Sequence, residues 1–355
     1  PAQLSDCPQR ERENGETEML TIFVTAVNAI LPIVLLIALG YGLRQCSFLT
    51  KEFVAGGNKL MFRLLIPLML FTNTYTIESF SSVPWDLTLY GAGMVLVIFL
   101  LGYFLTPGLT REPGRKGALL QSTFRSNTAV IGISLAQALG GEEAVQVATV
   151  VTAVCVPLLN VLAVVALSLY GSNGGKLDGK KLLKNIVTNP LILGIAAGFL
   201  CVALRAAEKA VFGSVVFTLG GNLQFLYSAL RQAGSIATPF ALIILGAQFN
   251  FAAMGDMKKE ILWGTAWRVV IAPALGLGAA IALNQFGVLH CASADYPALI
   301  ALFGTPTAVS SAVMAGQMGC DEQLATQIVV WSSVASIFTL FVTVCLLMGM
   351  GLLIV

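Results

Sequence analysis

Long apolar runs, separated by short polar breaks, follow one another along the chain from about residue 20 to its end. The runs lack the in–out alternation of membrane β-strands, and most approach the roughly 20 apolar residues that a spanning helix needs. Because only helices and closed barrels satisfy the backbone in lipid, the pattern predicts membrane-spanning helices. Ten segments are long enough or nearly so: Leu20–Leu43, Phe53–Thr76, Trp85–Thr106, Gly114–Leu139, Ala144–Tyr170, Leu182–Leu204, Leu223–Phe249, Ile261–Leu283, Tyr296–Met318 and Gln323–Leu353.

The composition agrees with a lipid environment. The chain is 57% hydrophobic and 11% charged, with a mean hydropathy of +0.85, whereas about a quarter of the residues of a soluble domain are charged. Residues 1–18 differ, because they are polar and lack the apolar run of a signal peptide. We interpret them as a disordered tail or an expression remnant. The net charge of +2 gives no indication of a nucleic-acid partner, and the scattered cysteines indicate no metal site and no cofactor.

Basic residues are concentrated in alternate loops between the predicted helices. Lys and Arg are frequent after the first, third, fifth and seventh predicted helices, whereas the loops after the second, fourth and eighth carry acids. Short basic loops remain in the cytoplasm. We therefore expect a multi-pass protein of the cell membrane with both termini extracytoplasmic, which requires an even number of helices. The basic loop residues are Arg44, Lys51, Arg111, Arg115, Lys116, Lys176, Lys180, Lys181, Lys184, Lys258 and Lys259.

The two halves of the chain resemble each other. At an offset of 179 residues, Thr128–Val130 matches Thr307–Val309, and Phe124 matches Phe303. Each half holds five predicted helices, an odd number, so the second half enters the membrane from the opposite side, as in many secondary transporters. Chance similarity among apolar helices is the alternative. Weaker matches pair Pro32 with Pro190 and Pro67 with Pro239, and the predicted units are 19–170, a cytoplasmic linker 171–181, and 182–355.

Polar, helix-breaking residues interrupt the fourth and ninth predicted helices at matching positions. The fourth contains "RSNT" from Arg125, and the ninth contains "GTPT" from Gly304. Ser, Thr and Asn favour helix starts, and Pro interrupts a helix. A helix that stops and restarts presents unpaired N–H groups and a partial positive charge, and two such breaks brought together would bind an anion. A kink with only a packing role is the alternative.

Three arginines lie within or near predicted spans, Arg63, Arg125 and Arg268, whereas all eighteen acids lie in the tail, the loops or at helix ends. A cation deep in the membrane usually faces a partner or a cavity. We expect Arg125, beside the first break, to bind an anionic substrate, and we expect Arg63 and Arg268 to snorkel to the interface. The absence of an intramembrane acid disfavours carboxylate-pair proton antiport, while sodium coupling stays open.

These motifs resemble the auxin efflux carrier family. The stretches are "LLQSTFRSNTAVIGISLAQALGGEEA", "VTNPLILGIAAGF" and "TPTAVSSAVMAGQMGCDEQLATQIV". The resemblance implies an all-α integral membrane protein, here expected to be a bacterial member. It implies ten transmembrane helices in two inverted five-helix repeats, as in sodium/proton antiporters and bile-acid symporters. Helices 1, 2, 6 and 7 would form a scaffold and a homodimer interface, and helices 3–5 and 8–10 a mobile transport domain in which discontinuous helices 4 and 9 cross.

We therefore predict a secondary active or facilitative transporter of small organic anions, such as dicarboxylates or auxin-like acids, that works by elevator-type alternating access. The closest alternative is a sodium-coupled symporter of the bile-acid type. An intramembrane enzyme is disfavoured, because no Ser–His or paired-Asp arrangement lies in a span. Expected partners are the organic anion, the lipid bilayer and a coupling Na⁺ or H⁺. Expected substrate-binding residues are Arg125, Asn127, Thr128, Thr305, Pro306, Thr307, Ser310, Asn73 and Gln121.

Overall fold

The computed structural model describes residues 24, 27–28, 30–77, 84–171 and 179–353. Apart from one isolated β-bridge, the described residues form helices, turns and loops, so the prediction of an all-helical membrane protein is confirmed. Residues 1–18 and most of the linker 171–181 lie outside the described part. Seven described helical rods are long and apolar enough to span a membrane: Lys51–Tyr75, Trp85–Gly108, Ile133–Tyr170, Pro190–Phe212, Gln224–Gln248, Met254–Gln285 and Glu322–Gly349.

The rods are assembled from shorter helices that often continue through a π-helical turn. After a helix at Ile30–Gln45, the α-helices are α2 (Lys51–Leu60), α3 (Ile66–Tyr75), α4 (Trp85–Leu105), α5 (Pro113–Phe124), α6 (Ile133–Tyr170), α7 (Gly179–Val187), α8 (Pro190–Phe212), α9 (Leu219–Asn222), α10 (Gln224–Ser235), α11 (Ala237–Gln248), α12 (Lys258–Ala266), α13 (Ala272–Gln285), α14 (Tyr296–Leu299), α15 (Ser310–Gln317) and α16 (Glu322–Gly349). The π-helical turns are η1 (Met61–Leu65), η4 (Thr128–Gly132), η6 (Trp267–Ile271) and η8 (Ile300–Gly304).

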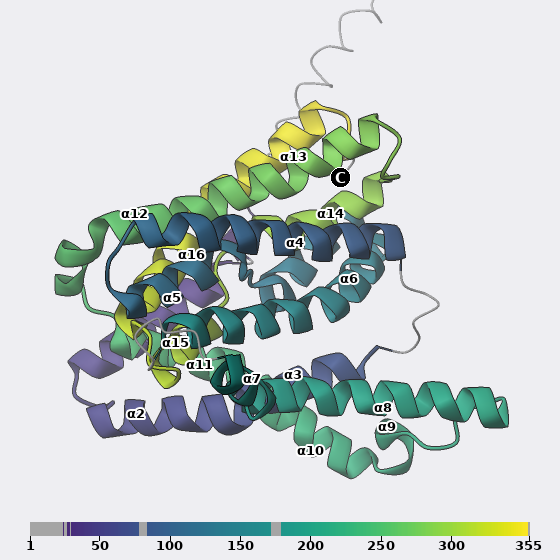
Figure 1. Cartoon of the computed structure of the whole chain (residues 1–355), viewed down its shortest axis with the longest axis horizontal. Coiled ribbons are helices and arrows are strands. Elements are labelled where there is room, and N and C mark those ends of the chain that lie inside the picture. The colour runs from purple at the N-terminus through teal and green to yellow at the C-terminus, as the bar shows by residue number, and fades with distance from the viewer. Residues whose placement is uncertain (1–23, 25–26, 29, 78–83, 172–178, 354–355) are drawn as a thin grey trace, which may run out of the picture.

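The helices pack in two groups. The first group contains the helix Ile30–Gln45 with α2, α3, α8, α10 and α11, and the second contains α4, α5, α6 and α12 to α16. Figure 1 shows α2, α8 and α10 along the lower edge of the molecule and α4, α12 and α13 along the upper edge. The groups meet where α11 and η1 contact α15 and where α3 contacts α6.

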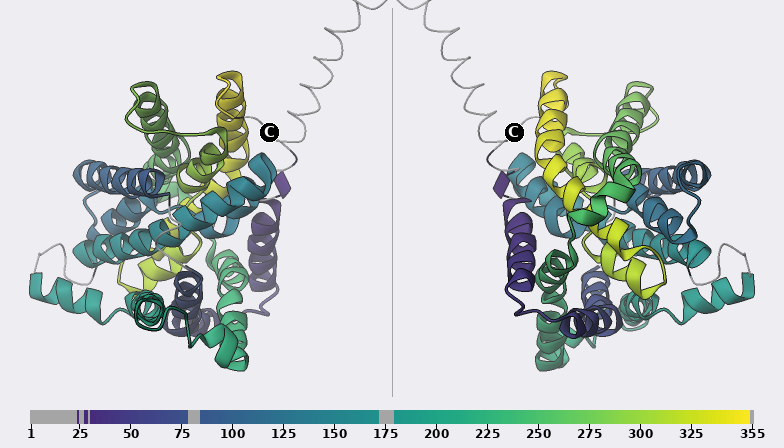
Figure 2. Two further views of the ribbon diagram at one scale, coloured as in Figure 1. Left: turned by 90° about the vertical axis from the view of Figure 1, so that its right-hand side faces the viewer. Right: turned by 90° about the vertical axis from the view of Figure 1, so that its left-hand side faces the viewer.

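Glycines bring helices of the first group into close contact. A Cβ atom added at Gly40 would lie 2.0 Å from the carbonyl oxygen of Ile243, and one at Gly246 would lie 1.9 Å from that of Ile37. The helix Ile30–Gln45 therefore lies directly against α11, as Figure 2 shows in purple and green. In the same way, α8 lies against α3, because a Cβ at Gly198 would meet Thr74 at 2.6 Å. Small residues at such contacts are typical of membrane helices.

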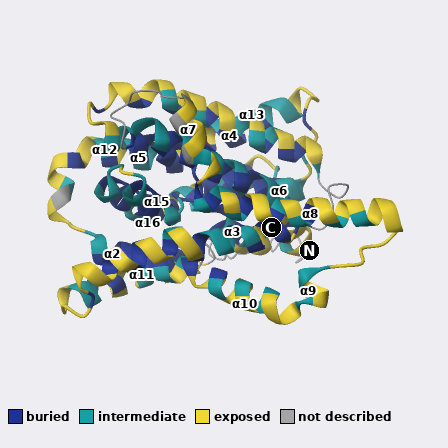
Figure 3. Cartoon of the chain, turned by 60° about the horizontal axis from the view of Figure 1, so that its bottom comes forward, coloured by how far each residue is buried: buried dark blue, intermediate teal, exposed yellow. Residues whose placement is uncertain are grey.

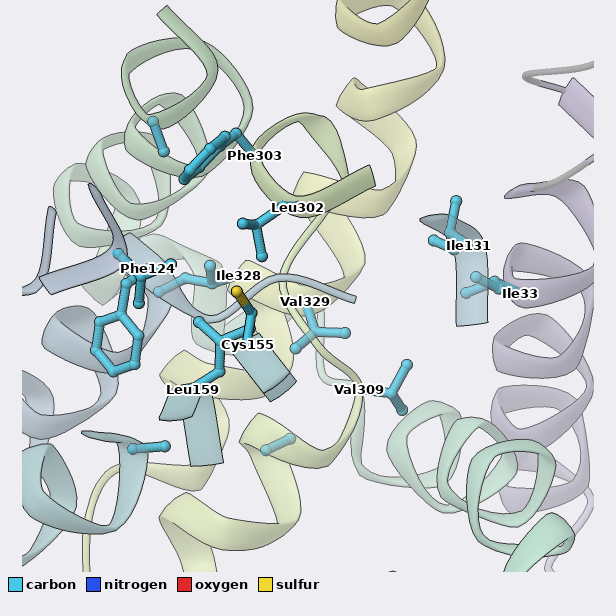
Figure 4. Packing of buried hydrophobic residues seen from close by; sticks show 14 of the residues in the cluster. Ile33, Phe124, Ile131, Cys155, Leu159, Leu302, Phe303, Val309, Ile328 and Val329 are labelled. Carbon is cyan, nitrogen blue, oxygen red and sulfur yellow. The ribbon is translucent and has the colours of Figure 1, made fainter. Parts of the chain in front are cut away.

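The second group contains the most deeply buried helices of the core. All residues of α5 from Gly117 to Phe124 are buried, as are Ser311 to Ala315 of α15. Figure 3 shows this contrast with α8 and α10, whose outer faces are exposed. Phe124 packs edge-on against Phe99 of α4, and other core members appear in Figure 4. The interior elements are thus shielded by protein, which permits irregular backbone at that depth.

The start of one span differs from the sequence prediction. The span predicted to begin at Leu182 begins at Pro190, because a separate short helix, α7, precedes it. Asn189 caps the start of α8, because its side chain accepts a hydrogen bond from the N–H of Leu191 at 2.9 Å. Pro190 takes the first helical position. The long helix α6 is kinked at Gly140 and Gly141, between the predicted spans that end at Leu139 and begin at Ala144, and the φ of +62° at Gly141 is one that glycine adopts without strain.

Candidate functional site

Both predicted helix breaks are present, and they contact each other. Helix α5 ends at Phe124, and Arg125 has an extended backbone (φ −82°, ψ 95°). The turn η8 ends at Gly304, and Thr305 is likewise extended (φ −71°, ψ 152°). Between the two breaks, the N–H of Asn127 donates to the carbonyl of Pro306 at 2.8 Å, and the N–H of Ala308 donates to that of Arg125 at 3.1 Å.

Local hydrogen bonds explain why the chain adopts this shape. The Thr305 hydroxyl donates to the carbonyl of Ala301 at 2.8 Å and closes the last turn of η8. Pro306 has no N–H to continue that helix. The hydroxyls of Ser126 and Thr128 lie 2.6 Å apart across the other break. The breaks are therefore built from residues whose side chains form hydrogen bonds with nearby residues of the same segment.

Arg125 reaches from the first break to the start of α15. Its side chain is 2% exposed, and it donates to Ser310 Oγ and Asn160 Oδ1 at 2.9 Å each. Longer contacts of 3.4 Å join it to Gln121 Oε1 and Ser311 Oγ. All four acceptors are neutral. Ser310 and Ser311 begin α15, so the guanidinium lies at the positive end of that helix.

A cavity opens beside this arginine, between the two helix groups. The first group contributes apolar side chains such as Met61, Met69 and Leu70 to its lining. The second group contributes Arg125, Asn127, Asn160 and Ser310. Among the described residues, the lining contains no Asp or Glu and no charged side chain besides Arg125. The cavity therefore combines one cation, several hydrogen-bonding groups and an apolar wall.

The cavity continues toward one end of the molecule. A second cavity shares Leu70, Asn73, Ala129 and Val156 with it and extends to Thr76 and Thr149. At the opposite end, Glu322 Oε1 of α16 accepts hydrogen bonds from Asn58 Nδ2 of α2 at 2.8 Å and from Gln248 Nε2 of α11 at 2.7 Å. The two helix groups are thus joined by hydrogen bonds at the end that carries Glu322.

Four of the residues expected from the sequence line the cavity: Arg125, Asn127, Ser310 and Asn73. Gln121 lies behind Arg125 and donates to the carbonyl of Ser311 at 3.0 Å. The other four, Thr128, Thr305, Pro306 and Thr307, are buried at the crossing and do not line the cavity. Their contacts hold the two breaks in shape, and the N–H of Thr307, for example, donates to Ser332 Oγ at 3.2 Å.

Sequence reasoning missed Asn160 and misplaced Arg268. Asn160 is a single amide within the apolar run of α6, and intramembrane polar residues of this kind deserve a functional interpretation. Arg268 does not snorkel: its side chain is 0% exposed, and it donates to main-chain carbonyls of the second group. The expectation failed because a hydropathy pattern does not tell which side of a helix faces protein. Arg63 is exposed, as snorkelling requires.

Comparison with known proteins agrees with this architecture. The chain is 21% identical over 322 residues to an uncharacterized transporter of Methanothermobacter thermautotrophicus, a match that covers 90% of this chain and 97% of that protein. A family model described as membrane transport protein matches residues 25–344. That family includes the auxin efflux carriers whose motifs the sequence resembles. The chain therefore belongs to the membrane transport protein family.

Proposed function

We propose that this transporter carries small organic anions and that Arg125 binds their carboxylate in the cavity between the two helix groups. The observation that carries the proposal is the buried guanidinium of Arg125, which has neutral acceptors and lines a cavity without an acid among the described residues.

The charge balance favours an anionic ligand. A cation deep in the membrane costs about 2.5–3.5 kcal/mol on insertion scales when it is unpaired. Arg125 lies at the N-terminus of α15, where the helix dipole adds to the unfavourable positive potential. A carboxylate in the cavity would offset both contributions, and the planar guanidinium is suited to bind it with two parallel hydrogen bonds.

The cavity lining favours a single carboxylate attached to an apolar body. One end of the ligand would meet Arg125, Asn127 and Asn160, and the other would face Met61 and Met69. A second carboxylate would be placed against thioether and aliphatic side chains, which do not replace its hydration. We therefore favour aromatic or branched monocarboxylates over dicarboxylates as substrates.

Several features support ten crossings in two inverted repeats. The seven long rods are joined by the helix Ile30–Gln45 and by two interrupted segments, one through α5 into the start of α6 and one from α14 to α15. The Gly140–Gly141 kink separates the fourth crossing from the fifth. The repeat also predicts which residues meet, because Asn127 and Pro306 are equivalent at the 179-residue offset and hydrogen-bond to each other.

Contacts within the first helix group also support two inverted repeats. The run from Pro32 matches the run from Pro190, so Gly40 corresponds to Gly198. A Cβ added at Gly40 would meet Ile243 of α11, and one added at Gly198 would meet Phe71 and Thr74 of α3. When Pro67 is matched with Pro239, Ile243 corresponds to Phe71. Equivalent glycines therefore pack against equivalent positions, as a two-fold axis in the membrane plane requires.

The location of the cavity supports elevator-type transport. Its charged end belongs to the second group and its apolar wall to the first, so sliding one group past the other would move the anion across the membrane. Near Glu322, Arg115 of α5 forms an ion pair with Glu260 of α12 at 3.2 Å and lies 3.4 Å from the carboxylate of Asp321. The basic loops near these residues favour the cytoplasm for that end. Dimerisation through the first group remains a prediction.

Binding calorimetry tests the proposal. Purified protein in detergent would be titrated with benzoate, indole-3-acetate, malonate and malate, in sodium chloride and again in choline chloride. We expect the two aromatic acids to bind the native protein and the Arg63→Ala variant, and to bind Arg125→Ala at least 30-fold more weakly. Undiminished affinity of Arg125→Ala would contradict the role of Arg125. Binding only in sodium chloride would instead favour the bile-acid type of symport.

A further inference from the structure

Arg268 lies where two half-helices end. It belongs to the π-helical turn η6, its side chain is fully buried, and its Nε donates to the carbonyl of Thr305 at 3.0 Å. Its Nη2 donates to the carbonyl of Phe303, and contacts of 3.5 Å reach the carbonyls of Leu302 and Thr123. All four acceptors are main-chain oxygens. Three come from the end of η8, and one comes from the end of α5.

This cluster of carbonyls requires a cation. The last carbonyls of a helix lack partners within the helix and carry a partial negative charge. Two such ends converge inside the second group, where the residues that carry them are buried and the low dielectric strengthens their repulsion. Carbonyls of unwound helices are also the ligands by which membrane transporters hold alkali-metal ions. The planar guanidinium of an arginine supplies five N–H donors and a permanent charge for the same purpose.

Among the described residues, no carboxylate pairs with Arg268. All its described hydrogen bonds go to carbonyls, and none goes to a carboxylate. The two buried arginines therefore differ in their surroundings. Arg125 meets side-chain amides and hydroxyls at the start of α15 and lines the cavity, whereas Arg268 meets helix ends and does not line it. A role in holding the ligand is thus open to Arg125 and not to Arg268.

We propose that Arg268 is a tethered cation that fills a carbonyl-lined cation site between the two half-helix ends. Its guanidinium holds the two helix ends together at the crossing. A free Na⁺ would have the same role in a protein that lacks this arginine. The part of the inference that concerns transport rests on the proposed function: anion carriage then needs no Na⁺ at the crossing. The part that concerns the cation site does not depend on any substrate.

Chemical rescue tests the cation site. The Arg268→Ala variant would be purified in choline chloride, and its thermal unfolding would be followed with added guanidinium, sodium or tetramethylammonium chloride at equal, low concentrations. We expect its unfolding temperature to lie about 5 °C or more below that of the native protein. Guanidinium should restore most of the loss, sodium should restore part of it, and tetramethylammonium should restore none, because it cannot enter the carbonyl cluster.

Arg63→Ala is the matched control, because Arg63 occupies another π-helical turn, η1, but is exposed. No added cation should stabilise this variant or the native protein. Full stability of Arg268→Ala in choline, or equal effects of the three cations, would overturn the inference. If Arg268→Ala does not accumulate, Arg268→Lys should accumulate and Arg268→Met should not, and equal levels of these two variants would also overturn it. None of these measurements uses an organic anion, so their failure is distinct from a failure of the proposed function.

Discussion

Glu322 should hold the two helix groups together at one end of the cavity. Its carboxylate accepts from Asn58 and Gln248 of the first group, at 2.8 and 2.7 Å, while its own helix belongs to the second group. A Cβ added at Gly316 would lie 2.6 Å from Glu322 Cδ, so the carboxyl group is confined against α15. Any sliding of the groups must break both hydrogen bonds.

The magnitude follows from these two contacts. A hydrogen bond to a charged group contributes about 1.5–3 kcal/mol. Glu322 is only partly buried, and water would solvate all three side chains after separation, so we expect a net loss of about 2–3 kcal/mol in Glu322→Ala. Such a change shifts the equilibrium between two conformations about 30- to 150-fold.

Cysteine accessibility measures this shift. Ala241 lines the cavity and is 2% exposed, so Ala241→Cys in a background without other reactive thiols reports entry of a membrane-impermeant reagent from the Glu322 end. Glu322→Ala should accelerate labelling by more than tenfold. Glu260→Ala is the matched control, because Glu260 bonds Arg115 within the second group and should leave the rate unchanged. An unchanged rate in Glu322→Ala would refute the reasoning.

Three further outcomes are expected. Asn160→Ala should weaken anion binding about tenfold by calorimetry, because it removes an acceptor that holds Arg125 at 2.9 Å; unaltered affinity would argue against this positioning. Gly40→Ala should lower the yield of folded protein in a size-exclusion assay, since its Cβ would lie 2.0 Å from a carbonyl oxygen, whereas Gly42→Ala meets no atom within 4 Å and should be tolerated. A cysteine at Lys258 should be labelled only from the cytoplasm, and labelling from outside would reverse the proposed orientation.

The sequence predicted the helices and the two breaks because those features depend on local chemistry. Apolar length defines a span, and the stretches from Arg125 and from Gly304 contain residues that stop a helix wherever they occur. The match between the halves indicated that the breaks would meet. The boundary at Pro190 was missed because only Thr188 and Asn189 separate the amphipathic helix α7 from α8.

The site was predicted less completely because it depends on which side of each helix faces the cavity. Thr305 and Thr307 lie in the break, yet their side chains are buried at the crossing, while Ser310, the first residue of α15, reaches Arg125. Asn160 lies 35 residues from Arg125 in the chain, and only the packing of α5 against α6 brings them together. Burial of Arg268 likewise follows from tertiary packing.

Counterflow in proteoliposomes tests the central claim most directly. Vesicles loaded with the acid that binds best in calorimetry would be diluted into buffer containing the same acid in radiolabelled form, without sodium. The native protein should accumulate label transiently, the Arg63→Ala variant should do the same, and Arg125→Ala should remain at the level of empty vesicles. Accumulation by Arg125→Ala equal to that of the native protein, or none by the native protein, would contradict the account.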